Sequence, residues 1–282
     1  GKFRAHLAHH QTELEYATET LRTLQPHEEV VIADWKMKIL PQYHRENQDK
    51  FFGKNGTSQL GFMTIKKMAD GSFASKYVLM LTPDSKQDAY SIACGKLLLY
   101  SNYLSDETTA VKYVSDGAGP FRGTLSRAYQ SYWKEWTGID EVSYRVTPPG
   151  GGKSPLDAEF GREVQVLRKG VNKGYDFTDC DSIALALEKG GGLLGTTVLR
   201  YVPDRSAERE VKFAAKRDTY TLSLLEGDTQ SFFHYSGRGV ALNLSKSDFL
   251  WADNNGKFVA TKKQALVPRL EAVKPAFTFK VY

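Results

Sequence analysis

Three aspartates occupy positions at which a carboxylate could bind a divalent metal ion. Asp34 lies within the apolar stretch 30–40, where an ionised carboxylate is unfavourable unless it is paired or bound to a metal. Asp116 follows the apolar stretch 110–115 and precedes a glycine-rich turn, and Asp157 follows a proline suited to a helix start. Taken alone, Asp116 could be a turn residue and Asp157 an acid favoured by the helix dipole. The three positions together favour one shared site.

Alternation of apolar side chains and turn signals predict the elements that hold these acids. We expect strands at 30–40, 60–68, 73–81, 110–115 and 141–146, and helices at 3–24, 85–104, 124–136, 155–171 and 179–188. Three strands, a helix, a strand, a helix, a strand and a helix is the order of a ribonuclease-H-like α/β domain, a mixed sheet flanked by helices. The first strand, the fourth strand and a late helix then carry the acids.

The glycine cluster 190–192 predicts a domain boundary. We therefore expect an N-terminal helix within residues 1–28, a ribonuclease-H-like core in residues 29–190, and a small β-rich C-terminal module in residues 191–282. The chain starts with Gly1 rather than methionine, so we expect it to be part of a longer protein.

Carboxylates that converge from distant segments can hold two Mg²⁺ or Mn²⁺ ions, because hard cations prefer oxygen ligands. Such a pair, about 3.5–4 Å apart, stabilises the attacking and leaving oxygens during phosphodiester cleavage. We expect Asp34 to bridge the ions while Asp116 and Asp157 each complete one shell. Glu159 is an alternative to Asp157, since acids two positions apart on a helix face different ways.

Four segments resemble transposase-derived proteins of eukaryotes, whose ribonuclease-H-like catalytic domain is of the DDE/DDD kind. They are residues 34–38 (DWKMK), 52–56 (FGKNG), 115–119 (SDGAG) and 152–160 (GKSPLDAEF). The resemblance covers about residues 30–190 and implies that Asp34, Asp116 and Asp157 bind the metal ions. It also implies a nuclear protein of DNA recombination. Gly117 replaces the usual asparagine and Asn55 the usual arginine, which leaves open an altered or lost activity.

Composition is compatible with a DNA partner without proving one. The net charge is +5 and the isoelectric point is near 8.9, a mildly basic balance that suits a polyanion. No stretch approaches the roughly 18 apolar residues needed to cross a bilayer, so we expect no membrane partner.

Five basic residues are candidates for contact with nucleic acid. Lys36 and Lys38 share a strand face with Asp34, and could contact phosphate or pair with the acids. Lys153 lies in a glycine-rich loop that could approach a DNA strand. Arg162 belongs to a helix whose basic side chains could equally form a solvated face, and Arg238 to a segment that could be an ordinary β-turn.

These features predict a metal-dependent nuclease that cleaves DNA and transfers the freed strand, as a homodimer or a larger assembly on DNA. One alternative is a domesticated module that keeps the fold and binds nucleic acid or protein without catalysis. Another is a hydrolase of the ribonuclease H or resolvase kind, which cuts and never joins strands.

Overall fold

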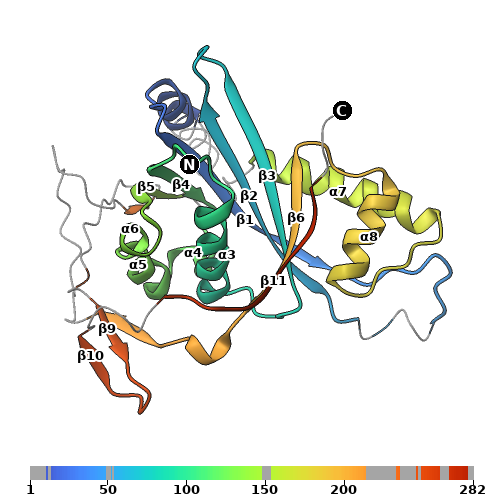
Figure 1. Ribbon diagram of the computed structural model, residues 1–282. Coiled ribbons are helices and arrows are strands. Elements are labelled where there is room, and N and C mark those ends of the chain that lie inside the picture. The colour runs from blue at the N-terminus through green and yellow to red at the C-terminus, as the bar shows by residue number, and fades with distance from the viewer. Residues whose placement is uncertain are drawn as a thin grey trace, which may run out of the picture.

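The structure is a computed structural model that describes residues 11, 14–48, 52, 54–147, 154–213, 233–235, 246, 249–260 and 267–278. Its centre is an eight-stranded mixed sheet with the strand order β11-β6-β3-β2-β1-β4-β5-β8 (Figure 1). Helices cover both faces of this sheet, which is the ribonuclease-H-like α/β arrangement that the order of elements predicts.

The middle of the sheet is formed by five strands. They are β1 (Glu28–Ile39), β2 (Thr57–Lys67), β3 (Phe73–Thr82), β4 (Ala110–Ser115) and β5 (Asp140–Val146). β1, β2 and β3 form an antiparallel meander, while β4 runs parallel to β1 and β5 runs parallel to β4. Val31, Leu60 and Leu79 are fully buried, because helices pack on both faces of these strands.

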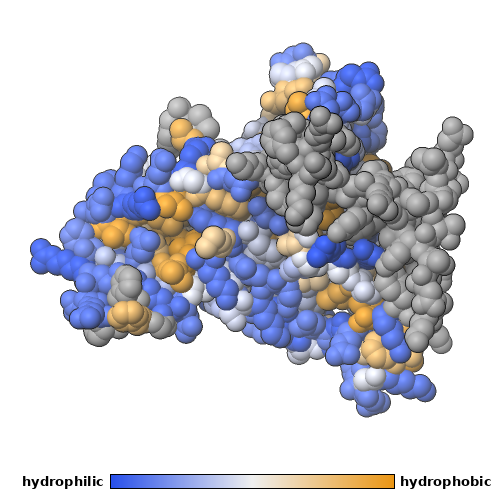
Figure 2. All heavy atoms as spheres, turned by 180° about the vertical axis from the view of Figure 1, so that it is seen from behind, coloured by the Kyte–Doolittle hydropathy of each residue, from blue (hydrophilic) through white to orange (hydrophobic). Residues whose placement is uncertain are grey.

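One face of the sheet packs against α3 (Ala89–Asn102) and three short helices, and the other against α7 (Pro155–Asn172) and α8 (Cys180–Gly190) (Figure 1). α7 and α8 cross closely. A Cβ atom at Gly170 would lie 2.3 Å from the carbonyl oxygen of Ala186, so only glycine permits this contact. Seen from behind, hydrophobic patches lie among hydrophilic side chains on the side of α7 and α8 (Figure 2).

The prediction of one helix over residues 124–136 is wrong. The segment forms two short helices, α5 (Thr124–Gln130) and α6 (Trp133–Thr137), and a third, α4 (Gly119–Arg122), precedes it. The chain leaves α5 through tight turns in which the amides of Ser131 and Tyr132 donate three residues back. These turns let Tyr129 and Trp133 both enter the core, where their ring centroids lie 6.3 Å apart.

The N-terminal helix is described over residues 14–22, and residues 3–10, 12 and 13 of its predicted range lie outside the described residues. It rests on the sheet near β4 and β5. Thr20 and Leu24 are buried, and the guanidinium of Arg145 on β5 stacks 3.7 Å from the ring centroid of Tyr16. No helix in the described part of the chain is long and apolar enough to cross a membrane.

The C-terminal residues are only partly a separate module. β7 (Val211–Phe213), β9 (Phe249–Ala252) and β10 (Phe258–Ala260) form a small antiparallel sheet, as expected. β6 (Thr196–Pro203), β8 (Phe233–Tyr235) and β11 (Leu270–Thr278) instead join the central sheet. The central sheet therefore contains strands from both sides of the boundary predicted at residue 190. The reason is that β6 pairs with the free edge of β3 and buries Val198, Leu199 and Tyr201 there.

Candidate metal centre

Asp34 and Asp116 lie at the same edge of the sheet because β1 and β4 are parallel neighbours. The last pair in their register joins Ala33 to Ser115, so Asp34 is the next residue of β1 and Asp116 directly follows β4. Ligands of open α/β sheets gather at this carboxyl edge of parallel strands. Asp116 starts a turn in which its Oδ1 accepts the amide N–H of Ala118 at 3.1 Å.

Asp157 lies in the first turn of α7 and belongs to a capping box. The hydroxyl of Ser154 accepts a backbone N–H of this turn, while the amide of Ser154 donates to Oδ2 of Asp157 at 2.8 Å. This reciprocal pair satisfies two amides that the helix start leaves without partners. Asp157 therefore does act as a helix-start acid, and its exposed side chain lies beside the N-terminus of α7.

The three acids influence one another electrostatically. Burial and, to a smaller extent, the negative charges of Asp116 and Asp157 together raise the pKa of Asp34 to about 7. Burial also raises the pKa of Asp116, against the N–H of Ala118 and the positive charge of Arg122. Two like charges close together cannot both ionise freely. A divalent cation between them would remove this repulsion.

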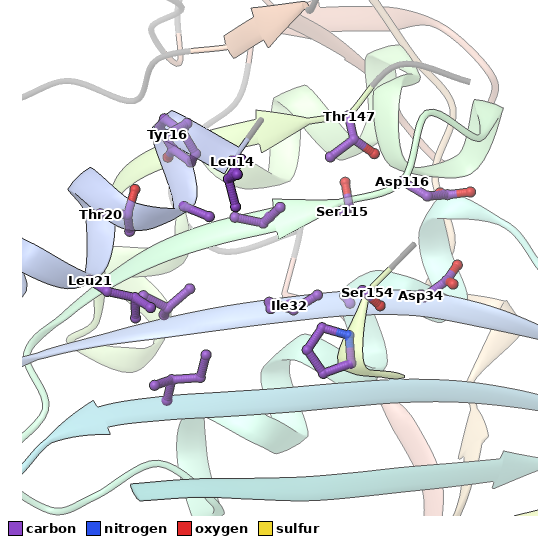
Figure 3. A pocket seen from close by; sticks show the side chains of 16 residues that line it. Leu14, Tyr16, Thr20, Leu21, Ile32, Asp34, Ser115, Asp116, Thr147 and Ser154 are labelled. Carbon is purple, nitrogen blue, oxygen red and sulfur yellow. The ribbon is translucent and has the colours of Figure 1, made fainter. Parts of the chain in front are cut away.

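A pocket of about 270 Å³ opens beside the acids (Figure 3). Side chains of the N-terminal helix, Leu14 and Leu21 among them, form one end. Asp34 and Asp116 lie together at the other end, with Ser154 of the α7 start nearby. The pocket therefore has an apolar end under the helix and an acidic end at the strand edge.

The three aspartates do not form a closed ligand shell. Among the described residues, no group of three or more His, Cys, Asp and Glu side chains is arranged to hold a metal ion. Asp34 and Asp116 share the pocket, whereas the carboxylate of Asp157 is bound to its own helix end. The donor set suits a hard divalent cation in its chemistry, and Asp157 uses one carboxylate oxygen, Oδ2, in the capping box.

Glu159, the alternative third acid, points elsewhere. Its side chain is 1% exposed, pairs with Arg162 at 2.7 Å and accepts the hydroxyl of Thr196 on β6 at 2.7 Å. A carboxylate with these two partners is committed to packing α7 against β6. Of the two acids in this turn, Asp157 is the one whose charge acts on Asp34.

The basic candidates have different surroundings. Lys36 is mostly buried and pairs with Glu163 on α7 at 2.6 Å, so its ammonium serves an internal contact. Lys38 is exposed, and Arg162 is half-exposed in its pair with Glu159. Lys153 and Arg238 lie outside the described residues. Contact of these residues with nucleic acid remains a prediction.

Three features near the acids have no counterpart in the sequence-based expectations. Glu163 is a fully buried acid on α7, Gln59 on β2 donates to it, and Thr147 lines the pocket. The buried Oγ1 of Thr147 has no hydrogen-bond partner among the described residues. A signal existed for Glu163 alone: it follows Glu159 by four residues, and residues with that spacing share a helix face.

Comparisons with known proteins do not assign a function to this chain. No protein-family model and no curated protein matches the chain. Among solved structures, the crystal structure of the Mos1 strand transfer complex matches with 14% identity and a TM-score of 0.29. The match covers 56% of this chain and 46% of that chain, so it spans under half of the known protein's length. At such values the likeness carries no argument about function.

Proposed function

We propose that this protein is a metal-dependent nuclease that cleaves phosphodiester bonds of DNA at the edge of β1 and β4. The observation that supports it best is the pair of Asp34 and Asp116 at one end of the pocket, with the charge of Asp157 acting on Asp34. Carboxylates that repel one another and resist ionisation are typical of functional sites.

The chain would hold Mg²⁺ or Mn²⁺ through Asp34 and Asp116, with Asp157 as the third ligand. Bound divalent ions would stabilise charge on the attacking and leaving oxygens of a phosphodiester. Asp34 lies within β1, and its backbone is held by pairing with Gly61 on the neighbouring strand β2. Asp116 is held by its turn, and Asp157 by its capping box.

Strand transfer is the finer part of the proposal. After cleavage, a freed 3′-hydroxyl of one DNA strand would attack a second DNA at the same acids, with two copies of the protein acting together on DNA. The resemblance of segments 34–38, 52–56, 115–119 and 152–160 to transposase-derived proteins supports this step. The exposed Lys38 and the overall charge of +5 agree with a polyanionic partner.

The test is cleavage of end-labelled duplex DNA with Mg²⁺, with Mn²⁺ and with EDTA, for the wild type and Asp34→Ala. We expect metal-dependent nicking that Asp34→Ala abolishes, because the acid on which the charges of both others act is lost. Equal cutting by both proteins would refute the assignment, and no cutting by either would favour the non-catalytic module. Joined products on a denaturing gel separate a strand-transfer enzyme from a simple hydrolase.

A further inference from the structure

A group of three polar side chains joins β1, β2 and α7 beneath the candidate site. Nζ of Lys36 on β1 pairs with Oε2 of Glu163 on α7 at 2.6 Å, and Nε2 of Gln59 on β2 donates to both oxygens of that carboxylate at 3.0 and 2.9 Å. The side chain of Glu163 is 0% exposed and that of Lys36 is 11% exposed. We call these three residues the bridging cluster.

The bridging cluster connects the two elements that carry Asp34 and Asp157. Lys36 follows Asp34 by two residues, so the two side chains leave the same face of β1. Glu163 follows Asp157 on α7 by six residues, which is about 9 Å along the helix axis. One ion pair therefore fixes where α7 stands along β1, and with it where the helix start stands relative to Asp34.

The backbone of β1 is anchored at the same point. β4 stops pairing with β1 at Ala33, and beyond it the side-chain amide of Gln87 donates to the carbonyl oxygen of Lys36 at 3.0 Å. Lys36 is thus held through its backbone by the segment before α3 and through its side chain by α7. Burial raises the pKa of Glu163, against the positive charge of Lys36.

α7 packs directly on the sheet beside the bridging cluster. Gly61, the β2 partner of Asp34, lies under Phe160 of α7, where a Cβ atom would come 2.6 Å from the ring atom Cζ. A helix in such direct contact cannot slide without changing the gap between Asp34 and the helix start. Interior packing transmits a shift of this kind, because it leaves few voids.

We propose that the bridging cluster is a positioning device, which sets the separation of Asp34 from Asp157 and so tunes the metal centre. This inference rests on the metal-dependent function proposed above. Residues that orient metal ligands typically change metal affinity or activity by about 10–100-fold when they are substituted. Lys36 then acts on the reaction through α7, without needing contact with DNA.

The experiment compares Glu163→Gln with Glu141→Gln, a substitution in an equally buried lysine–glutamate pair on the opposite face of the sheet. Mn²⁺ binding is measured by the electron paramagnetic resonance signal of the free ion. We expect Glu163→Gln to weaken Mn²⁺ binding by about 10-fold or more, and to lower kcat while KM for DNA stays within about twofold. Glu141→Gln should bind Mn²⁺ as the wild type does.

Conservative substitution adds a rescue test. Lys36→Arg keeps the positive charge and should retain most of the Mn²⁺ affinity, whereas Lys36→Met should lose as much as Glu163→Gln. Thermal unfolding of each variant shows whether it is folded at the assay temperature. Wild-type Mn²⁺ affinity in folded Glu163→Gln, or an equal loss in Glu141→Gln, would overturn the positioning role.

A distance measurement keeps the inference separate from the proposed function. Spin labels at Met37→Cys on β1 and Gln165→Cys on α7, both exposed positions, report the separation of the two elements without metal or DNA. Glu163→Gln should shift or broaden this distance, and Glu141→Gln should not. If the wild type binds no Mn²⁺, the proposed function fails, and an unchanged distance in Glu163→Gln would in addition refute the positioning role.

Discussion

Two buried lysine–glutamate pairs lie on opposite faces of the sheet and differ in what they connect. Lys96 on α3 pairs with Glu141 on β5, and Lys36 on β1 pairs with Glu163 on α7. Both glutamate side chains are 0% exposed. Replacing either cation would leave a carboxylate inside the protein without its counter-charge, which is strongly unfavourable.

The Lys96 pair is enclosed by aromatic rings. Nζ of Lys96 lies 4.0 Å from the ring centroid of Tyr113 and 4.7 Å from that of Trp133, and the hydroxyl of Tyr100 donates to Glu141. Burial lowers the pKa of Lys96 and raises that of Glu141. Cation–π contacts gain strength in such a desolvated place. This pair stabilises packing within the α3 face.

The Lys36 pair lies at the meeting of three elements and next to an acid of the candidate site. Amide groups dominate here, since Gln59 donates to Glu163 and Gln87 donates to the backbone of Lys36. The ring of Phe160 lies farther off, 5.7 Å from Nζ of Lys36. Two buried lysine–glutamate pairs can thus have different structural roles. The aromatic enclosure stabilises one layer of the fold, and the bridging cluster fixes the relation between two layers.

Lys96→Met should have the largest effect on stability. We expect a loss of about 3–5 kcal/mol in the free energy of unfolding, because Glu141 keeps a buried charge without a cation. Urea denaturation followed by tryptophan fluorescence measures it. The double variant Lys96→Met/Glu141→Leu should recover most of the loss. A single variant within about 1 kcal/mol of the wild type would show that the pair is not needed for packing.

Lys36→Met should destabilise less, by about 2–3 kcal/mol, because Gln59 still donates to both oxygens of Glu163. The same denaturation assay applies. The two lysine variants should also differ in Mn²⁺ affinity, which falls in Lys36→Met and stays unchanged in Lys96→Met. Equal Mn²⁺ affinities would remove the functional difference between the two pairs.

Substitution of one glycine on each face of the sheet tests the same difference between the two faces with a smaller effect on stability. A Cβ at Gly61 would meet Phe160 of α7 at 2.6 Å, and one at Gly95 would meet Leu60 at 2.7 Å on the α3 face. We expect Gly61→Ala and Gly95→Ala each to lower the free energy of unfolding by about 1–2 kcal/mol through overpacking. Only Gly61→Ala should weaken Mn²⁺ binding in titrations, since it alone displaces α7. Similar weakening in Gly95→Ala would contradict this.

Asp34→Asn should give the smallest effect, and one that depends on pH. The carboxyl of Asp34 ionises in the unfolded chain near its ordinary pKa, but in the folded protein only near pH 7. The folded state therefore binds the proton more tightly between these values, and wild-type stability falls as pH rises toward 7. Without metal, Asp34→Asn should be more stable than the wild type by about 1 kcal/mol at pH 8, after allowance for solvent screening.

Thermal unfolding at pH 5 and pH 8 measures this difference, which should be clearly smaller at pH 5, because most of the loss develops between pH 5 and pH 7. Mg²⁺ at pH 8 should reverse the order, because a cation that binds the folded wild type stabilises it by mass action. A difference that is independent of pH would show that Asp34 ionises normally.

Several elements of the fold follow from local patterns. The strand at 110–115 is confirmed at its predicted ends, and α7 begins at the predicted Pro155, since apolar alternation and helix-start chemistry act within a few residues. The same local patterns fail for the segment 124–136, where they predict one continuous helix. Its aromatic residues suit a helix, but their burial among side chains distant in the sequence breaks the segment into separate turns. Tertiary contacts of this kind override local propensity.

Sequence patterns alone place Asp34 within a strand, Asp116 at the end of another and Asp157 at a helix start, and they put Lys36 on the same strand face as Asp34. Those facts depend on alternation and on helix-start signals, which are local. The three-dimensional packing was needed to reveal that Glu159 accepts from Thr196, that Lys36 pairs with Glu163, and that β6 extends the central sheet. The physical reason is that the partner of a buried charge is chosen by the packing of α7 on the sheet, which joins residues more than a hundred positions apart.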